Sequence, residues 1–310
     1  MDKNSAIYIA GHTGLIGSSI TKILKEKGYK NLILKTKEEL NLLYQKEVEY
    51  FFKKEKPEYV FVCAGKTGGI KANIERKGEF IYENAQINLN LIHFSYIYKV
   101  KKLLYIGCSC MYPVNCPQPM KEEYLLTGKI EPTNESYAIA KISGLKMCQS
   151  YNYQYKTNFL TVIGGNVFGE GEKQFDEGAH VIPSLIKKFH QAIKRNLDKV
   201  EIWGKGTAKR DFIYVDDFSN ACIFLMENYD GDEVINIGRG EGVSIREIVE
   251  NLKEISGYQG KIIYNENMPE GAPIRILDIE KIKNLGWKPK ITIYEGLKKT
   301  YLWYIKNYGE

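Results

Sequence analysis

The sequence has few cysteines, no long apolar run and no strong excess of either charge. Six cysteines in 310 residues are too few for a secreted disulfide scaffold, so we expect free thiols in a reducing compartment. No apolar stretch approaches the roughly 18 residues that a membrane span needs, and MDKNSAIYIAGHTG lacks the basic and apolar regions of a signal peptide. These absences predict a cytoplasmic protein.

Low-complexity segments and fixed-period repeats are also absent. Against 38 Asp and Glu there are 44 Lys and Arg, and the resulting net charge of +6 is scattered along the chain. A nucleic-acid-binding protein is expected to gather such charge into one stripe beside a known motif. The four histidines and the cysteines show no zinc-ligand spacing, so we predict no metal site.

What is present is a regular alternation of short apolar runs and longer amphipathic stretches in the first half. We predict strands at residues 6–10, 31–35, 59–64, 102–107 and 159–164, and helices from about 14 and near 46–55, 84–99 and 136–155. Such alternation is typical of an α/β fold with a doubly wound parallel Rossmann sheet. Further along, VDDFSNACIFLME and VINIG look like additional sheet elements of this domain.

After Asn166 the pattern becomes irregular, Gly-rich and basic, as in GEGEKQFDEGAH and WGKGTAKRDF. This change predicts a smaller, discontinuous C-terminal α/β substrate domain. The expected division is residues 1–166 plus 214–238 for a nucleotide-binding Rossmann domain, 167–213 plus 239–292 for the substrate domain, and 293–310 for a C-terminal helix.

The segment GHTGLIG follows the first predicted strand directly and opens a helix. Its glycines suit a tight turn, a close approach of backbone to a pyrophosphate, and close packing of helix against strand. The helix N-terminus adds a favourable potential for phosphate. The candidate cofactor contacts in this loop are Gly11, His12, Thr13, Gly14, Leu15, Ile16 and Gly17.

The end of the second predicted strand indicates which dinucleotide binds. An NAD site usually presents a carboxylate there, but LILKTKEEL presents Lys35 and Lys37 instead. Two cations suit the 2′-phosphate of NADP, which is the cofactor that we predict. The alternative is that both lysines are solvated surface residues.

Tyr137 and Lys141 in NESYAIAKISG lie four residues apart and therefore on one face of a helix. We expect the ammonium to lower the phenol pKa from about 10 toward neutrality, so that the tyrosine can exchange a proton with a carbonyl or hydroxyl group. The pairs Tyr50/Lys54 and Tyr294/Lys298 share this spacing. Only Tyr137/Lys141 follows the CSC segment of the fourth predicted strand.

Several segments, taken in order, resemble one family. GHTGLIG, ELNLL, the GGI and Asn at 68–73, SCMYP, EPTNESYAIAK and HVIPSL are similar to the extended short-chain dehydrogenases, and most closely to the GDP-L-fucose synthase family. The similarity extends over residues 6–304. It implies a homodimeric enzyme that uses NADPH to reduce C4 of a GDP-4-keto-6-deoxy sugar, and in that family C3 and C5 are also epimerised.

The resemblance implies roles for the CSC segment. The family has a serine that polarises the substrate carbonyl at the position of Cys108, and an epimerase cysteine at the position of Cys110. Because a thiol is a weaker donor than a hydroxyl, Cys108 could act less well, Ser109 could replace it, or Tyr137 could act alone. The implied partner of Cys110 in epimerisation is His180, for which a helix-cap or surface role is the alternative.

The resemblance also implies positions for both ligands. The GDP-binding positions are Lys188, Trp203, Arg210, Glu270 and Arg275, and further cofactor contacts are Lys141, Gly164, Asn166 and Val167. Cations and an aromatic face suit a nucleoside diphosphate.

The chain departs from the family at Thr13, Gly164-Gly165 and Ile274-Arg275, where an arginine, Pro-Thr and Arg-Lys are usual. The Gly164-Gly165 pair removes side-chain volume beside Asn166. We therefore expect a sugar larger than a hexose, such as a 4-keto-6-deoxyheptose.

Two other functions stay open from the residues. One is a redox-neutral epimerase or dehydratase that retains NAD, and the other is a non-enzymatic dinucleotide-binding or RNA-binding module, suggested only by the basic charge balance.

Overall fold

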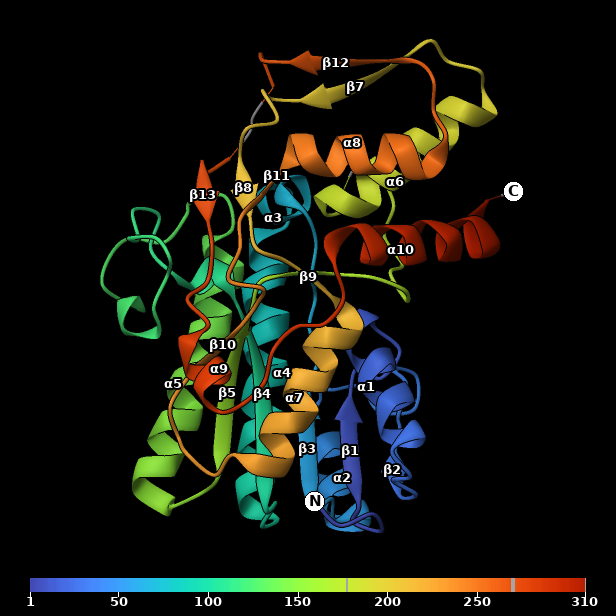
Figure 1. Cartoon of the computed structure of the whole chain (residues 1–310). Helices are drawn as coiled ribbons and strands as arrows, with labels where there is room; N and C mark the ends of the chain where they lie inside the picture. The colour runs from blue at the N-terminus through green and yellow to red at the C-terminus, as the bar shows by residue number, and fades with distance from the viewer. Residues whose placement is uncertain (177, 269–270, 310) are drawn as a thin grey trace.

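Six parallel strands form the central sheet of the protein (Figure 1). This computed structural model describes residues 1–176, 178–268 and 271–309. The strand order is β10-β5-β4-β3-β1-β2, with the bounds β1 Ile7–Ala10, β2 Leu32–Ile33, β3 Tyr59–Val62, β4 Lys102–Cys108, β5 Phe159–Gly164 and β10 Ile235–Ile237. The order reverses at β1, which defines the crevice where ligands of such sheets bind.

Helices cover both faces of this sheet because its strands are apolar on both sides. Ile7, Ile9 and Phe61 point into a cluster with α1 (Leu15–Glu26) and α7 (Val215–Asn228). Tyr8 and Val60 alternate with them and point into a second cluster with the helices α2 (Gln45–Glu55), α4 (Lys77–Ile97) and α5 (Glu135–Tyr155). The predicted parallel Rossmann sheet is confirmed.

A second group of elements lies at the top of Figure 1, above the central sheet. It contains β7 (Lys199–Trp203) paired with β12 (Lys261–Asn265), β8 (Lys209–Arg210) between β11 (Val243–Ser244) and β13 (Ile274–Arg275), and the helices α6 (Val181–Lys194), α8 (Ile245–Ser256) and α10 (Ile293–Tyr308). These helices share a separate apolar cluster. The pair β6 (Asn166–Phe168) and β9 (Phe212–Tyr214) also contributes to it.

Short elements complete the described chain: α3 (Ile70–Glu75), the 3₁₀ turns η1 (Ser109–Met111) and η2 (Glu122–Tyr124), and α9 (Glu280–Asn284). Among the helices of the described residues, none combines the length and the apolar character of a membrane span. The six cysteines are free thiols.

One expected strand is a helix. VDDFSNACIFLME forms α7, and its first turn carries Asp216 and Asp217, the acidic residues that a helix N-terminus favours. The predicted domain boundaries stay a prediction. Within the described residues, Leu277, Ile279 and Ile282 pack into the apolar cluster of the central sheet.

Candidate active site

The glycine loop follows β1 at the point where the strand order reverses. Gly11 has φ +84°, and a Cβ there would lie 2.7 Å from the backbone nitrogen of Ala64. A Cβ on Gly17 would lie 2.2 Å from the carbonyl oxygen of Gly11, so helix and turn are in contact. Gly14 is exposed and caps α1, whose first N–H groups have no intrahelical partner. This cradle fits the pyrophosphate of a dinucleotide.

Positive charge gathers beside the loop. Thr13 is exposed, and the half-buried His12 has a buried Nδ1 atom with no hydrogen-bond partner in the described structure. Burial lowers the pKa of His12, and the positive charges of Lys173 and Lys25 lower it further.

A backbone hydrogen bond at Lys35 and the Glu39 carboxylate act on the His12 pKa in the opposite direction. Lys35 is half-buried and Lys37 is exposed. Sequence reasoning missed Lys173 because this residue lies in the loop after β6, more than 130 positions after Lys35 and Lys37 in the chain.

Lys141 is held beneath Tyr137 by strand β4. Its Nζ donates to the carbonyl oxygen of Ile106 at 2.9 Å, and lies 5.2 Å from the ring centroid of Tyr105 and 5.9 Å from that of Tyr137. Burial lowers the pKa of this lysine, while the charges of the nearby cysteines raise it. The ammonium therefore lies beneath the Tyr137 ring.

The pKa of the Tyr137 phenol differs from our expectation. This pKa is raised well above 10, first by loss of solvent and then by the neighbouring sulfurs of Cys108 and Cys110. The ring packs edge-to-face on Phe80, with 6.1 Å between centroids. The predicted lowering of this pKa by Lys141 is wrong because burial and the neighbouring thiols raise it instead. Tyr137 is therefore a protonated acid at neutral pH.

The two cysteines of CSC lie together with Tyr137. Cys108 ends β4, and Cys110 lies in the 3₁₀ turn η1. The side chain of Cys108 shares hydrogen bonds with those of Cys110 and Tyr137. Although burial opposes it, the bond from Cys110 and the charge of Lys141 lower the pKa of Cys108. The same bond and burial raise the pKa of Cys110, so the shared proton lies on Cys110.

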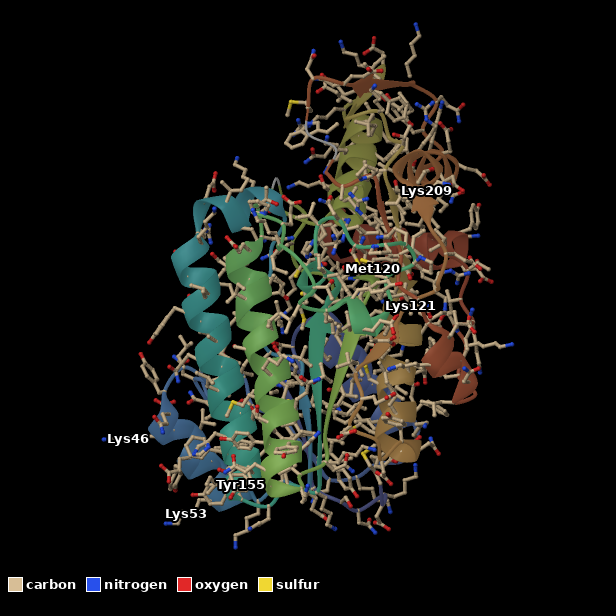
Figure 2. The ribbon with its side chains drawn as sticks, turned by 90° about the vertical axis from the view of Figure 1, so that its left-hand side faces the viewer. Lys46, Lys53, Met120, Lys121, Tyr155 and Lys209 are labelled. Carbon is tan, nitrogen blue, oxygen red and sulfur yellow. The ribbon has the colours of Figure 1, made fainter. Side chains whose placement is uncertain are left out.

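Arg275 reaches this turn from β13. Its Nη2 donates to the carbonyl oxygens of Ser109 at 2.6 Å and Tyr112 at 3.3 Å, and its Nη1 to that of Pro113 at 3.4 Å. The resemblance implied that Arg275 binds GDP, whereas these contacts hold the backbone of the cysteine turn. Nearby, Met120, labelled in Figure 2, donates its N–H to Ile276 O at 2.7 Å.

The loop that carries His180 is attached to the GGI segment. The N–H of Gly69 donates to Gly178 O at 2.7 Å, and the Nδ2 of Asn73 donates to Gly68 O at 2.8 Å. His180 itself is exposed and caps the N-terminus of α6. Within the described residues, no hydrogen bond joins His180 to Cys110.

The predicted GDP-binding residues form two groups. Lys188 Nζ lies 5.6 Å from the ring centroid of the half-exposed Trp203 and donates to Glu201 O at 3.0 Å. Arg210 is the register partner of Arg275 in the β8–β13 pair. Glu270 lies outside the described residues.

The space beside Asn166 is filled by the protein. A Cβ on Gly164 would lie 2.8 Å from the Phe218 ring, and one on Gly165 would lie 2.8 Å from Asp211 O. The two glycines therefore allow close internal packing, and the volume of their missing side chains is taken up by Phe218 and Asp211. Our reason for expecting a heptose from this pair is wrong.

Sequence reasoning missed the residues that fix helix α5 on β4. Asn88 Nδ2 donates to the Tyr105 hydroxyl at 3.0 Å and to Ala140 O at 3.0 Å, and that hydroxyl donates to Lys141 O at 3.1 Å. Asn84 and Asn88 lie four apart in a predicted helix, where asparagine is unfavourable. That spacing was the available signal for a buried polar contact.

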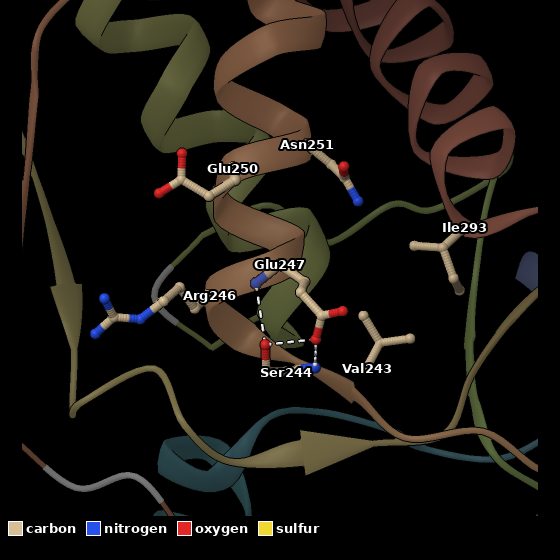
Figure 3. A pocket seen from close by; sticks show the side chains of 7 residues that line it. All are labelled: Val243, Ser244, Arg246, Glu247, Glu250, Asn251 and Ile293. Atoms are coloured by element: carbon tan, nitrogen blue, oxygen red, sulfur yellow. Dashed lines mark hydrogen bonds between the residues drawn. The ribbon is translucent and has the colours of Figure 1, made fainter.

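A cavity of about 450 Å³ lies elsewhere, at the start of α8 (Figure 3). It contains none of the predicted site residues. Ser244 and Glu247 at its wall satisfy each other in a capping box, with Glu247 N donating to Ser244 Oγ at 3.1 Å. Among the described residues, no group of three or more His, Cys, Asp or Glu side chains is placed to hold a metal ion.

Fold and site together define a dinucleotide-dependent enzyme. The model of the NAD dependent epimerase/dehydratase family matches residues 7–238, and the chain belongs to this family.

Particular relatives are closely similar. The chain is 46% identical over 306 residues to GDP-L-fucose synthase 1 from Arabidopsis thaliana, covering 99% of this chain and 95% of that one. It is 40% identical over 312 residues to GDP-L-fucose synthase from Escherichia coli, covering 97% of each. A solved GDP-mannoheptose C4 reductase from Campylobacter jejuni with NADP bound has a TM-score of 0.90 and 41% identity, covering 98% of this chain and 99% of that chain. The predicted resemblance to GDP-L-fucose synthases is confirmed.

Proposed function

We propose that this protein is an NADPH-dependent reductase that acts on C4 of a GDP-4-keto-6-deoxy sugar. The observation that carries the proposal is the placement of a protonated Tyr137 above the Lys141 ammonium, at the carboxyl end of β4. The glycine cradle after β1 and the relatives' shared activities support the same assignment.

The residues have defined roles in this reaction. NADPH supplies the hydride that reduces the C4 carbonyl carbon. Tyr137 donates its phenolic proton to the oxygen on which negative charge develops. The Lys141 ammonium, fixed on Ile106 O, then stabilises the phenolate that remains. Because a thiol is a weaker hydrogen-bond donor than a hydroxyl and the pKa of Cys108 is lowered, which favours its acceptor form, we assign carbonyl polarisation to Tyr137.

Epimerisation at C3 and C5 is part of the proposal only as a second activity. Cys110 is protonated and could return a proton to one face of the sugar ring. His180 is exposed on the loop that Gly69 holds, so it is available to a bound sugar on another face. Reduction does not depend on either group.

The substrate is expected to bind at the upper elements of Figure 1 through Lys188, Trp203 and Arg210. The hexose and heptose forms both stay candidates, because similar proteins are named for fucose and for mannoheptose. The Gly164-Gly165 pair does not distinguish them.

The decisive experiment follows NADPH absorbance with matched GDP-4-keto-6-deoxyhexose and GDP-4-keto-6-deoxyheptose, and then determines product stereochemistry. We expect stoichiometric NADPH oxidation and a C4 alcohol. Tightly bound NAD in the purified protein, with no net NADPH oxidation, would instead establish the redox-neutral epimerase. Salt-dependent RNA binding without sugar-nucleotide affinity would establish the non-enzymatic alternative.

We further propose that the protein works as a homodimer in the cytoplasm. Helices α4 and α5 lie side by side in Figure 2, with Tyr155 labelled at their lower end. They expose large apolar side chains: Tyr82, Leu89, Ile97, Ile139, Tyr153 and Tyr155. Such a surface fits a second copy of this chain. Light scattering after gel filtration is expected to give twice the chain mass of 35.6 kDa.

A further inference from the structure

The CSC segment brings two thiols within bonding reach of each other. Cys108 and Cys110 are two residues apart, Cys108 caps the 3₁₀ turn that contains Cys110, and a side-chain hydrogen bond between the two thiols acts on both pKa values. Disulfides join residues whose Cα atoms are roughly 4.4–6.8 Å apart. Residues two apart on a tight turn lie within about 7 Å. Both cysteines keep part of their surface exposed to solvent.

The charges around the pair prepare one sulfur for reaction. Cys108 accepts a hydrogen bond from Cys110, and the cations Lys141 and Arg275 both favour its thiolate form. The thiolate is the nucleophile in cysteine oxidation, and a neighbouring thiol is the usual resolving group. Cys63 also lies near Lys141, but burial raises its pKa to about 12, so it lacks this thiolate character.

We propose that Cys108 and Cys110 form a reversible disulfide when the enzyme meets a peroxide, and that this modification switches off the reductase. The effect on activity depends on the function proposed above, but the modification itself does not. The pair is thus an oxidation site built into the reaction centre.

The chemistry balances in two steps. The Cys108 thiolate attacks one oxygen of hydrogen peroxide, the O–O bond breaks, and sulfenic acid forms with release of the other oxygen as hydroxide. The Cys110 sulfur then attacks the sulfenic sulfur, the S–S bond forms, and the hydroxyl group leaves as water with the proton of Cys110. The two sulfurs lose two electrons, and the peroxide gains them.

Oxidation removes groups that the reaction centre uses. The Cys110 proton is lost, and the Cys108 sulfur can no longer become a thiolate, which removes its contribution to the pKa of Tyr137 beside that of burial. The turn that joins β4 to Tyr112 also becomes a closed ring, which constrains the side chains that contact Tyr137. A thiol reductant reverses each change.

The test is a mass measurement on the full chain carrying Cys116→Ala, so that the peptide between Lys102 and Lys121 contains only the two cysteines of interest. Protein treated with hydrogen peroxide is quenched in acid, alkylated with iodoacetamide and digested. We expect the peptide to lose two hydrogens and to resist alkylation at both sulfurs, while Cys63 is alkylated. Dithiothreitol should restore both thiols.

Matched variants locate the bond. Cys108→Ser and Cys110→Ser should each show no loss of two hydrogens, and Cys110→Ser should gain oxygen at Cys108 instead. NADPH oxidation with a GDP-4-keto sugar should fall in proportion to the disulfide and recover with dithiothreitol.

Other outcomes would overturn the inference. They are full alkylation of both cysteines after peroxide, a bond from either cysteine to Cys63, or full turnover by the disulfide form. If the disulfide forms but fresh reduced protein never oxidises NADPH with any GDP-4-keto sugar, the proposed function fails and the modification stands.

Discussion

The surroundings of Tyr137 decide in which direction its proton moves. A phenol whose pKa lies above 10 carries its proton at neutral pH, so it can serve as the proton donor. Reduction of a ketone requires such an acid, because the incoming hydride leaves negative charge on oxygen. We therefore expect Lys141 to matter most after proton transfer, when its charge would face a phenolate.

Removal of the Tyr137 hydroxyl is expected to lower kcat/KM for ketone reduction by roughly 10²–10⁴-fold, the usual contribution of general acid catalysis. Tyr137→Phe should leave the affinity for NADPH nearly unchanged. Stopped-flow reduction and fluorescence titration measure the two quantities. Tyr294→Phe is the matched control, because Tyr294 has the same spacing to a lysine but lies on α10 and donates to Glu254. Equal turnover by both variants would contradict the assignment.

A serine at position 108 is expected to change the pH dependence of reduction. Burial is the main cause of the raised pKa of Tyr137 and the Cys108 sulfur adds to it, so Cys108→Ser, which cannot ionise near neutral pH, should lower that pKa. Since reduction uses the protonated phenol, activity should disappear at a lower pH than in the parent protein. A pH–rate profile of kcat measures the shift. Cys116 is a buried cysteine that takes no part in the contacts among Cys108, Cys110 and Tyr137. Cys116→Ser should therefore leave the pH–rate profile unchanged.

At the scale of helices and strands, the sequence predicted correctly those elements whose local pattern of apolar residues marks them. The strands of the central sheet are nearly continuous apolar runs, so β1, β3, β4 and β5 lie where expected. The expectation of a strand at α7 was wrong because the short apolar run at 222–225 fits a buried strand as well as a buried helix. Only Asp216 and Asp217 at the start of this segment favoured a helix. Contacts across the chain, such as Arg275 on the Ser109 carbonyl, leave no local pattern.

The glycine pair after β5 gives a test of packing. Gly164→Ala places a Cβ 2.8 Å from the fully buried Phe218 ring, and such overpacking typically costs about 1–3 kcal/mol. Gly78→Ala in α4 is the control, because a Cβ there meets nothing within 4 Å and alanine favours a helix by roughly 0.5–1 kcal/mol. Urea unfolding compares the two. A stable Gly164→Ala variant that loses activity on larger sugars while keeping activity on hexoses would restore our first interpretation.

On the scale of the whole molecule, one carboxylate joins segments far apart in the chain. Asp211 accepts from the backbone N–H groups of Arg239 at 2.8 Å, Gly240 at 3.1 Å and Leu277 at 3.3 Å. A Cβ on Gly238 would lie 2.3 Å from its Oδ2 atom. The candidate catalytic residues could be selected from the sequence because a resemblance marked them, but this junction could not, since its partners are mostly backbone atoms.

Asp211 also makes stability depend on pH. Burial raises its pKa from 3.8 to about 6, so the folded protein binds this proton more tightly than the unfolded chain. That contribution is complete below pH 4 and is lost as the pH rises through 6. The free energy of unfolding of the parent, relative to Asp211→Asn, should therefore fall by about 3 kcal/mol from pH 4 to pH 7. Urea unfolding at several pH values measures it, and a constant difference would contradict the prediction.

The guanidinium of Arg275 has a consequence for protein engineering. It begins on the strand beside Arg210, where a sugar nucleotide is expected, and ends on three carbonyl groups of the cysteine turn. A designer who replaces it to change nucleotide preference will also loosen the turn that carries Cys110. Selectivity and reactivity cannot be adjusted independently at this position, and a useful redesign must supply new donors for those carbonyls.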